Sequence, residues 1–308
     1  MRVAVTGATG TIGSAVVRAL QERGDSVVAL TRDPDRASER LGAAIEARLW
    51  ANPKSEPAPA DALAGCDGVV NLLDEPVDQR WSEAAKREIR DSRVLGTRNL
   101  VEGLRAADPR PRMLVSQSAS GFYGPRGDQP VDETAPAASG DFLAEVVVAW
   151  EHEARRAEEL GTRVATTRTG VVLAQGGGAL AKMLPPFRMG VGGPVAGGAQ
   201  YVPWVHVDDV AGAMLFALDT PAASGPINVA APEPVTNREL SRALGRVLRR
   251  PAFMPVPGFA LRVLYGEMAT IVTTGVRMMP KRLQELGYGW RQPDLEGALR
   301  AATGTRAS

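Results

Sequence analysis

The sequence predicts an α/β fold, a doubly wound parallel sheet of Rossmann-like type, followed by a small and mostly helical C-terminal domain. A β-branched run at 2–6 indicates a buried strand, helical spacing of apolar residues indicates a helix over 11–23, and residues 26–30 indicate a second strand. This strand–helix unit recurs further along the chain. Such alternation requires crossover connections, and these place successive strands in parallel.

The remaining elements divide the chain into two parts. Further strands are predicted at 68–73, 113–116 and 163–167, and further helices at 82–107 and 141–160. Residues 174–203 contain many glycines and prolines, and a long irregular stretch inside an enzyme-like domain typically covers a substrate. Short helices prevail in the tail, so we expect a cofactor-binding sheet domain over 1–230 and a substrate domain over 231–308.

Composition excludes several classes of protein. Of the 308 residues, 44% are hydrophobic and 23% are charged, which is typical of a globular chain. The net charge of +1 provides no concentrated positive field, so we expect neither a nucleic-acid nor a membrane partner. One cysteine and two histidines exclude multi-cysteine and histidine-rich metal sites, so no metal is expected. Because no export pattern is present, we expect a cytoplasmic location. We further expect a monomer or homodimer whose partner is a small-molecule substrate.

A glycine-rich motif connects the first predicted strand with the first predicted helix. It has the spacing Gly-x-x-Gly-x-x-Gly and consists of Thr6, Gly7, Ala8, Thr9, Gly10, Thr11, Ile12 and Gly13. The first glycine permits a tight turn, the second lets a pyrophosphate approach backbone N–H groups, and the third lets the helix lie close to the strand. The motif therefore predicts a dinucleotide site formed by these residues except Ala8, with a plain turn as the alternative.

The end of the second strand indicates which dinucleotide is bound. NAD sites place an acidic residue there to accept hydrogen bonds from the ribose hydroxyls. This chain has Thr31 and Arg32 instead, and a guanidinium suits the 2′-phosphate of NADP. Because Asp33 follows directly, a solvated arginine in a charged loop is the alternative. We expect NADP (NADPH) as the cofactor, with Thr31 and Arg32 among its contacts.

Further motifs carry a resemblance to a known family. They are Asn71-Leu72 with Glu75-Pro76, Arg80-Trp81, Ser92-Arg93-Val94 with Gly96-Thr97, and the stretches at 118–124, 204–209, 266–268, 280–283 and 293–296. With the glycine-rich motif, they resemble the extended short-chain dehydrogenase/reductase superfamily, and more narrowly its atypical branch of epimerase family proteins. The resemblance covers essentially the whole chain. It implies a Rossmann-like domain, a small C-terminal substrate domain and an NADP-type cofactor, and it adds Asn71, Leu72 and Leu73 to the cofactor contacts.

The chain departs from this family beside the nicotinamide. The family usually has Asn-Leu-Ala-Gly-Glu-Pro after the fourth strand, whereas this chain has Leu73 and Asp74 in place of the two small residues. Small residues leave room beside the nicotinamide ribose. The bulkier Leu73 and the charged Asp74 therefore alter the expected pose of the cofactor or of the substrate.

A second departure concerns proton transfer. Active members of the superfamily carry a tyrosine followed four residues later by a lysine, which lowers the tyrosine pKa so that the tyrosine can pass a proton to the reacting oxygen. The residues four places after the tyrosines of this chain are Gly127, Val205, Ala269 and Gln292. By resemblance, Phe142 and Val146 occupy the expected positions. The standard proton relay is therefore not encoded.

The candidate catalytic residues are Ser118, Tyr201 and Glu75. Ser118 follows a predicted strand at the place where related enzymes hold the substrate oxygen, with a turn hydroxyl as the alternative. Glu75 lies on the carboxyl edge of the sheet, where such folds bind ligands, with a solvated loop residue as the alternative. Tyr201 belongs to the segment expected to cover the substrate. The predicted substrate pocket also contains Arg80, Lys182 and Arg188.

These residues predict an NADP(H)-binding oxidoreductase or epimerase-type enzyme that lacks the Tyr-x-x-x-Lys pair and acts on a small polar substrate. One alternative is an NADP(H) sensor or scaffold without turnover, which the missing pair favours. Another is a non-redox isomerase or cyclase on the same fold, with Glu75 as the active group. Consumption of NADPH with a substrate separates the first reading from the other two.

Overall fold

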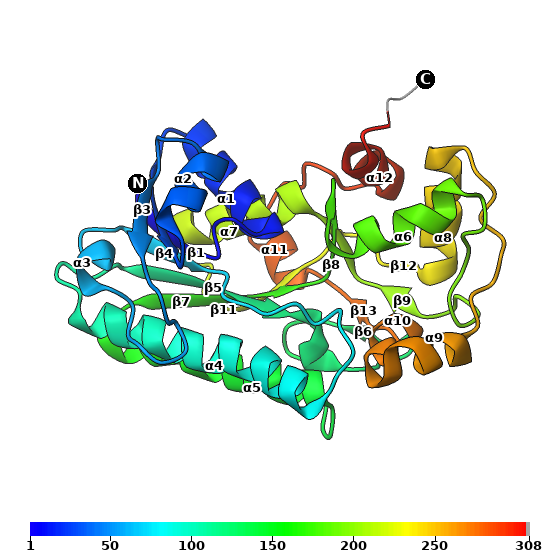
Figure 1. Ribbon diagram of the computed structural model, residues 1–308, viewed down its shortest axis with the longest axis horizontal. Helices are drawn as coiled ribbons and strands as arrows, with labels where there is room; N and C mark the ends of the chain where they lie inside the picture. Colours follow the sequence, from blue (N-terminus) through cyan, green and yellow to red (C-terminus); the bar gives the residue numbers. More distant parts are fainter. Residues whose placement is uncertain (306–308) are drawn as a thin grey trace.

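Seven parallel strands form the central sheet (Figure 1). The computed structural model describes residues 1–305. Across the sheet the order is β11 (Gly225–Val229), β7 (Arg163–Thr169), β5 (Met113–Ala119), β4 (Gly68–Asn71), β1 (Arg2–Thr6), β2 (Ser26–Thr31) and β3 (Glu46–Leu49). The chain runs outward from β1 to β3, returns to β4 and continues in the opposite direction. The direction of winding therefore switches between β1 and β4, which is where doubly wound sheets bind ligands.

Helices cover both faces of this sheet (Figure 1). One layer contains α1 (Thr11–Glu22), α2 (Pro34–Leu41) and α7 (Val207–Asp219), and the other contains α3 (Ala60–Leu63), α4 (Glu83–Ala106) and α5 (Phe142–Arg155). Strand β1 shows why both layers are needed. Val3 and Val5 belong to the hydrophobic cluster that includes α1 and α7, whereas Ala4 belongs to the cluster beneath α4. Alternate residues of a strand point to opposite faces, so this apolar run is buried on both sides.

A smaller lobe lies beyond the carboxyl ends of the strands. Its strand pairs are β8 (Val171–Ala174) with β10 (Trp204–His206), β9 (Tyr201–Val202) with β12 (Val235–Thr236), and β6 (Pro130–Val131) with β13 (Arg277–Met278). Its helices are α6 (Gly178–Arg188), α8 (Asn237–Leu248), α9 (Gly258–Tyr265), α10 (Thr270–Thr273) and α12 (Leu295–Thr303). Helix α11 (Lys281–Glu285) packs instead on β11 of the central sheet, where Leu283 joins the cluster that includes α1 and α7. Helices α6, α8 and α12 share a hydrophobic cluster around Trp204.

The predicted fold class is confirmed, and several predicted boundaries are corrected. Strand β5 continues to Ala119, so Ser118 lies within the strand and not beyond it. The segment 174–203 is not irregular throughout, because α6 occupies its first half and carries Pro185 and Pro186 near its C-terminal end. The helix predicted over 141–160 ends at Arg155 and continues as a 3₁₀ helix, η2 (Arg156–Leu160). No helix within residues 1–305 has the length and apolar character needed to cross a bilayer.

A buried carboxylate fastens the tail of the chain to the sheet domain. Asp209, near the start of α7, is 1% exposed. Its two oxygens accept hydrogen bonds from the backbone N–H groups of Arg291 at 2.6 Å and Gln292 at 2.9 Å. The hydroxyl of Tyr288 donates to the backbone oxygen of the same aspartate at 3.1 Å. These bonds hold the residues that precede α12.

Replacing this carboxylate should therefore loosen the tail. We expect Asp209→Ala to lower the free energy of unfolding by about 3 kcal/mol, because two buried N–H donors lose a charged acceptor. Amide hydrogen exchange at Arg291 and Gln292 should accelerate. The neighbouring Asp208→Ala is the control, since its ion pair with Arg18 is exposed and such pairs contribute about 0–1 kcal/mol. Equal losses in the two variants would contradict the assignment.

Candidate functional site

The glycine-rich turn between β1 and α1 has the geometry of a pyrophosphate site. Gly7 has φ +61°, and a Cβ added to it would lie 2.5 Å from the carbonyl oxygen of Leu72. A Cβ on Gly13 would lie 2.1 Å from the carbonyl oxygen of Gly7. At Gly10 the only such neighbour within 4 Å is the Gly7 oxygen at 3.3 Å. The first and third glycines are therefore required by the protein's own backbone, whereas the second has one close backbone neighbour and is otherwise exposed.

The N-terminus of α1 is available to an anion. Gly10 is the N-cap and has no side chain with which to bond the first turn, and no acidic residue lies in that turn. Gly10 and Thr11 are exposed, while Thr9 and Ile12 are half-buried. Unpaired N–H groups and the positive end of the helix dipole favour a phosphate at such a terminus. The residues present thus fit the pyrophosphate of a dinucleotide.

A buried polar network sets the position of this turn relative to β4. The Thr6 hydroxyl donates to the Asn71 side-chain oxygen at 2.9 Å and accepts from the Leu72 backbone N–H at 2.9 Å. The Asn71 amide donates to Thr97 at 2.9 Å and to Ser116 at 3.1 Å. Thr6 and Asn71 are fully buried, so their side chains hold β1 and β4 in register and do not reach a ligand directly.

At the end of β2 the arginine and the aspartate have different surroundings. Asp33 is the N-cap of α2, and its carboxylate accepts a hydrogen bond from the Arg36 backbone N–H at 3.0 Å. The Thr31 hydroxyl accepts from the Asp33 backbone N–H at 3.2 Å. Arg32 is exposed, and no carboxylate forms an ion pair with it within residues 1–305. The aspartate is thus occupied by the helix, whereas the guanidinium is available.

Helix α6 extends from the glycine-rich turn toward the loop that follows β4. A Cβ on Gly177, the N-cap of α6, would lie 2.6 Å from the Thr11 hydroxyl oxygen. Further along α6, Lys182 forms an ion pair with Asp78 at 2.6 Å and donates to its backbone oxygen at 3.0 Å. The segment 174–203 therefore begins directly against the candidate cofactor site. Arg188, at the end of α6, and Arg80 in the facing loop are both exposed.

The loop after β4 contains an acidic pair next to a buried arginine. Leu73 packs against Gly96, whose added Cβ would lie 3.1 Å from it, and Glu75 is half-buried. The Asp74 carboxylate lies 3.5 Å from the Arg93 guanidinium. Its side chain is 47% exposed, yet enough protein surrounds it that desolvation raises its pKa despite the arginine. A reachable carboxyl with a raised pKa is suited to carrying a proton.

Helix α5 contains neither a tyrosine nor a lysine. The Phe142 ring packs edge-on against Trp81 with centroids 5.2 Å apart, and the Lys86 ammonium lies 5.2 Å from its centroid. Val146 is 1% exposed. The helix that supplies the proton relay in related enzymes is therefore apolar where it starts.

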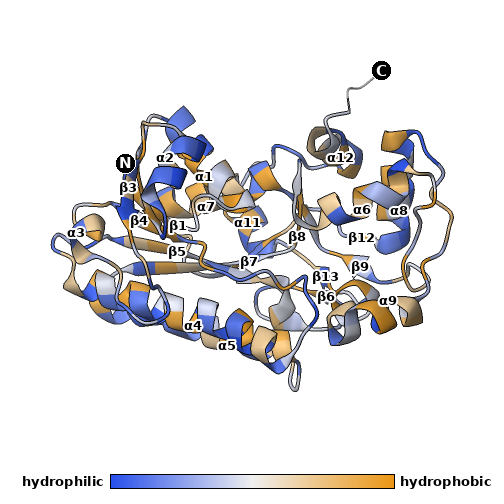
Figure 2. Ribbon diagram, viewed as in Figure 1, coloured by the Kyte–Doolittle hydropathy of each residue, from blue (hydrophilic) through white to orange (hydrophobic). Residues whose placement is uncertain are grey.

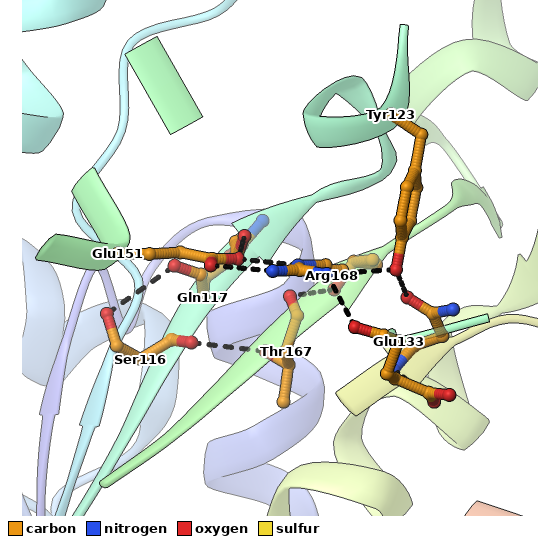
Figure 3. Close-up of polar contacts among 10 residues, drawn as sticks. Ser116, Gln117, Tyr123, Glu133, Glu151, Thr167 and Arg168 are labelled. Atoms are coloured by element: carbon orange, nitrogen blue, oxygen red, sulfur yellow. Dashed lines mark hydrogen bonds and ion pairs between the residues drawn. The ribbon is translucent and has the colours of Figure 1, made fainter. Parts of the chain in front are cut away.

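Ser118 belongs to a buried ionic network that sequence patterns did not indicate. It is 0% exposed, and its hydroxyl donates to Glu151 at 2.6 Å. The same carboxylate accepts two bonds from Arg168, from Nε at 2.8 Å and from Nη2 at 2.9 Å. Figure 3 shows Arg168 between Glu151 and Tyr123, whose hydroxyl accepts from Nη1 at 3.0 Å. The Ser118 hydroxyl thus already donates its hydrogen bond to Glu151, and its role toward a substrate stays a prediction.

Two further contacts complete this network. The Tyr123 hydroxyl donates to Asn228 on β11 at 2.7 Å, and the Arg168 guanidinium lies 3.4 Å from the Phe122 ring centroid. Burial lowers the pKa of Arg168, but its bonds with Glu151 outweigh that effect and raise it. The arginine is therefore charged, and it joins β7 to α5 and, through Tyr123, to β11.

Tyr201 lies beside an arginine that is also absent from the sequence predictions. The Arg277 guanidinium on β13 lies 5.1 Å from the Tyr201 ring centroid. The Arg277 Nε is buried and has no hydrogen-bond partner among the described residues. No hydrogen bond within residues 1–305 links Tyr201 to Ser118 or to Glu75, and of these three predicted residues only Ser118 is fully buried. Nor do the described residues contain a group of histidine, cysteine or acidic side chains arranged to hold a metal.

Comparisons with known proteins agree with this geometry. The model of the NAD dependent epimerase/dehydratase family matches residues 3–230, and a domain of unknown function, DUF1731, matches residues 256–302. The chain is 41% identical to the epimerase family protein SDR39U1 homolog, chloroplastic, of Arabidopsis thaliana, over 98% of this chain and 86% of that protein.

Two solved structures are also similar. Human epimerase family protein SDR39U1 (isoform 2), crystallised with NADPH, is 32% identical with a TM-score of 0.88, and the match covers 99% of this chain and 100% of that one. A nucleoside-diphosphate sugar epimerase from Corynebacterium glutamicum is 31% identical with a TM-score of 0.77, and the match covers 99% of this chain and 58% of that one.

The buried ion pair predicts a specific pattern of stabilities. Arg168→Met leaves the buried Glu151 carboxylate without its cation and should lower the free energy of unfolding by about 3–5 kcal/mol. Adding Glu151→Leu removes the unpaired charge and should recover most of that loss. Arg105→Met, which breaks an exposed pair with Glu102, is the control and should change stability by about 0–1 kcal/mol. Urea denaturation measures all four proteins. A double variant as unstable as Arg168→Met would refute the role of the unpaired charge.

Proposed function

Because this chain belongs to the NAD dependent epimerase/dehydratase family, we propose that it binds NADP(H) and acts as an oxidoreductase or epimerase-type enzyme on a small polar substrate. The observation that carries the proposal is the N-terminus of α1, which no side chain caps and where Gly10 and Thr11 are exposed. The human relative crystallised with NADPH supports the choice of cofactor. When bound, the nicotinamide supplies or accepts a hydride.

The roles of the chain's own residues follow from their positions. The backbone N–H groups of Thr11 and Ile12 would hold the pyrophosphate, because the Gly10 N–H already donates to Gly7, and Arg32 with Thr31 would hold the 2′-phosphate. Leu72 and Leu73 would border the nicotinamide side, with Thr6 and Asn71 as positioning residues behind them. The segment 174–203 would cover the substrate, since α6 begins beside Thr11 and its Lys182 reaches the loop after β4.

The division into a cofactor domain at 1–230 and a substrate domain at 231–308 stays part of this proposal. So do the cytoplasmic location and the two possible states, monomer and homodimer. Lys182 and Arg80 would lie at the edge of the substrate cleft, and Arg188 further out on α6.

Proton transfer needs a group other than the absent tyrosine–lysine pair. Asp74 is the strongest candidate, because its side chain is reachable and its pKa is raised by desolvation. A carboxyl group that keeps its proton at higher pH can donate it to a developing alkoxide. Tyr201 is the second candidate and would act from the opposite lobe. Glu75 would be the base if the reaction is an isomerisation or cyclisation.

Arg277 suggests what the substrate carries. The half-buried Arg277 guanidinium beside Tyr201 forms no ion pair within residues 1–305, so its accessible part provides a charged donor for a ligand. We therefore include an anionic group, a carboxylate or a phosphate, in the proposed substrate class.

The alternative of a cofactor sensor without turnover is supported by the apolar start of α5. It differs from the enzyme in one measurement. A sensor binds NADPH tightly and converts no substrate, whereas an oxidoreductase consumes NADPH with an anionic carbonyl compound. An epimerase-type enzyme and a non-redox isomerase both convert the substrate without net NADPH consumption, but only the epimerase-type enzyme requires the cofactor.

The cofactor assignment predicts that Arg32 determines the preference for NADPH over NADH. NADPH should bind more tightly than NADH, and Arg32→Ala should reduce the preference by about 10–100-fold, since a charge-assisted contact contributes about 1.5–3 kcal/mol. Arg40→Ala, an exposed arginine at the far end of α2, is the control. Gly10→Val should abolish binding of both cofactors in a folded protein. Fluorescence titration provides the affinities, and equal affinities of the native protein for NADPH and NADH would refute the assignment.

The missing relay predicts negligible turnover of simple aldehydes, ketones and unmodified sugars with either nicotinamide. On an accepted anionic carbonyl substrate, the rate should fall as pH rises through the raised pKa of Asp74, because only its protonated form donates. Asp74→Asn should lower the rate by about 10²–10⁴-fold and remove this pH dependence, with NADPH affinity unchanged. Tyr201→Phe is the comparison variant. Rapid turnover of simple ketones by the native protein would show that another donor is in place.

A further inference from the structure

One end of the small lobe concentrates positive charge. Residues 240–266 contain five arginines and no aspartate or glutamate. A shallow cavity of about 580 Å³ on α8 and the following loop is lined by Arg238, Arg242, Arg246, Arg249 and Arg250, together with Pro194, Gly245, Ala252 and Phe253. Arg246 is paired with Glu296, and Arg238 donates to the Gly197 oxygen. Within residues 1–305, no ion pair engages Arg242, Arg249 or Arg250.

The same end exposes most of the protein's accessible apolar side chains. All of the large hydrophobic residues that are exposed, apart from Met1, Leu49 and Val148, lie in 189–191 and 253–272. The two stretches are adjacent, because the Met254 backbone N–H donates to Gly192 at 3.2 Å and that of Val256 donates to Pro194 at 2.9 Å. We call the exposed residues Met189, Val191, Phe253, Met254, Phe259, Val263 and Leu264, with Arg238, Arg242, Arg249, Arg250 and Arg262, the end patch.

Helix α9 is the most unusual part of the end patch. None of its residues is buried, although most are apolar. Phe259 is 73% exposed, Val263 is 74% exposed and Leu264 is 65% exposed. In Figure 2, α9 is largely orange at the same end of the molecule as α8. Apolar side chains exposed this far on a helix are normally covered, so their exposure indicates a surface that binds a partner.

We propose that the end patch docks on an anionic lipid surface. Protruding phenylalanine, valine and leucine side chains would enter the headgroup–acyl boundary, and the unpaired arginines would bind lipid phosphates. Guanidinium groups bind phosphate oxygens in pairs, and the end patch contains no lysine. The balanced charge of the whole chain conceals this field, because the fold gathers the arginines at one end.

Other occupants fit less well. A second copy of this chain would place arginine cluster against arginine cluster, which is repulsive. A protein groove takes one stripe of a helix at i, i+3 and i+4, whereas α9 exposes Leu264 as well as the stripe of Phe259 and Val263. A lipid interface requires no complementary shape and accepts both.

Cosedimentation with vesicles tests the proposal. The full chain should bind vesicles of phosphatidylcholine with 30% phosphatidylglycerol and not vesicles of phosphatidylcholine alone. Arg242→Ala with Arg250→Ala should weaken binding by about 25-fold, at about 5-fold for each arginine. Phe259→Ser with Val263→Ser should weaken it by about 10-fold or more, including at 0.5 M salt, where charge is screened.

A matched control distinguishes binding through the end patch from general electrostatic attraction of the protein to anionic vesicles. Arg112 and Arg155 are exposed, lie outside the small lobe and have no ion pair within residues 1–305. Arg112→Ala with Arg155→Ala should leave vesicle binding within 2-fold of the native value. Thermal unfolding and NADPH affinity should be unchanged in all three variants. Absence of binding to the anionic vesicles, or equal losses in the patch and control variants, would overturn the proposal. So would binding to poly-glutamate without binding to vesicles, which would identify an acidic polypeptide as the partner.

Discussion

The carboxyl edge of the sheet depends on the buried ion pair between Glu151 and Arg168. Both side chains are about 5% exposed, and together with Ser118 and Tyr123 they join α5 to β5, β7 and β11. A buried pair of this kind adds little net stability compared with apolar residues, but it tolerates no loss of one partner. Its effect is geometric, because it fixes the position of α5 against the carboxyl ends of β5 and β7.

That geometry has a chemical consequence. The Ser118 hydroxyl donates to the Glu151 carboxylate of the ion pair, and α5 starts with Phe142 and apolar neighbours. The polar groups that remain accessible come from the loops, namely Asp74 after β4 and Tyr201 with Arg277 in the small lobe. A fold that usually supplies its proton relay from a rigid helix here presents its reactive candidates on connecting segments.

Local patterns were sufficient to predict five of the seven sheet strands and the glycine-rich turn, because each depends on neighbours in sequence, but they did not indicate β3 or β11. The burial of Ser118 was not predictable, since β5 extends past Ser116 only by pairing with β7, where Ser118 lies opposite Arg168. Glu151 and Arg168 are polar residues on separate elements, and only the tertiary fold brings them together. Pro185 and Pro186 suggested a loop, yet they lie near the end of α6, where few hydrogen bonds are lost. The sequence did not indicate Arg277, because the properties that single it out appear only in the folded structure: its place beside Tyr201 and an Nε without a hydrogen-bond partner among the described residues.

The arginines around α8 also restrict how this surface can be regulated. The chain has four lysines, and none lies between residues 240 and 266. A guanidinium stays protonated at every pH that a folded protein encounters, and it is not a target of lysine acetylation. The charge at this end of the molecule is therefore permanent. Any control over what it contacts has to come from ionic strength, from the composition of the opposing surface or from how much protein is made.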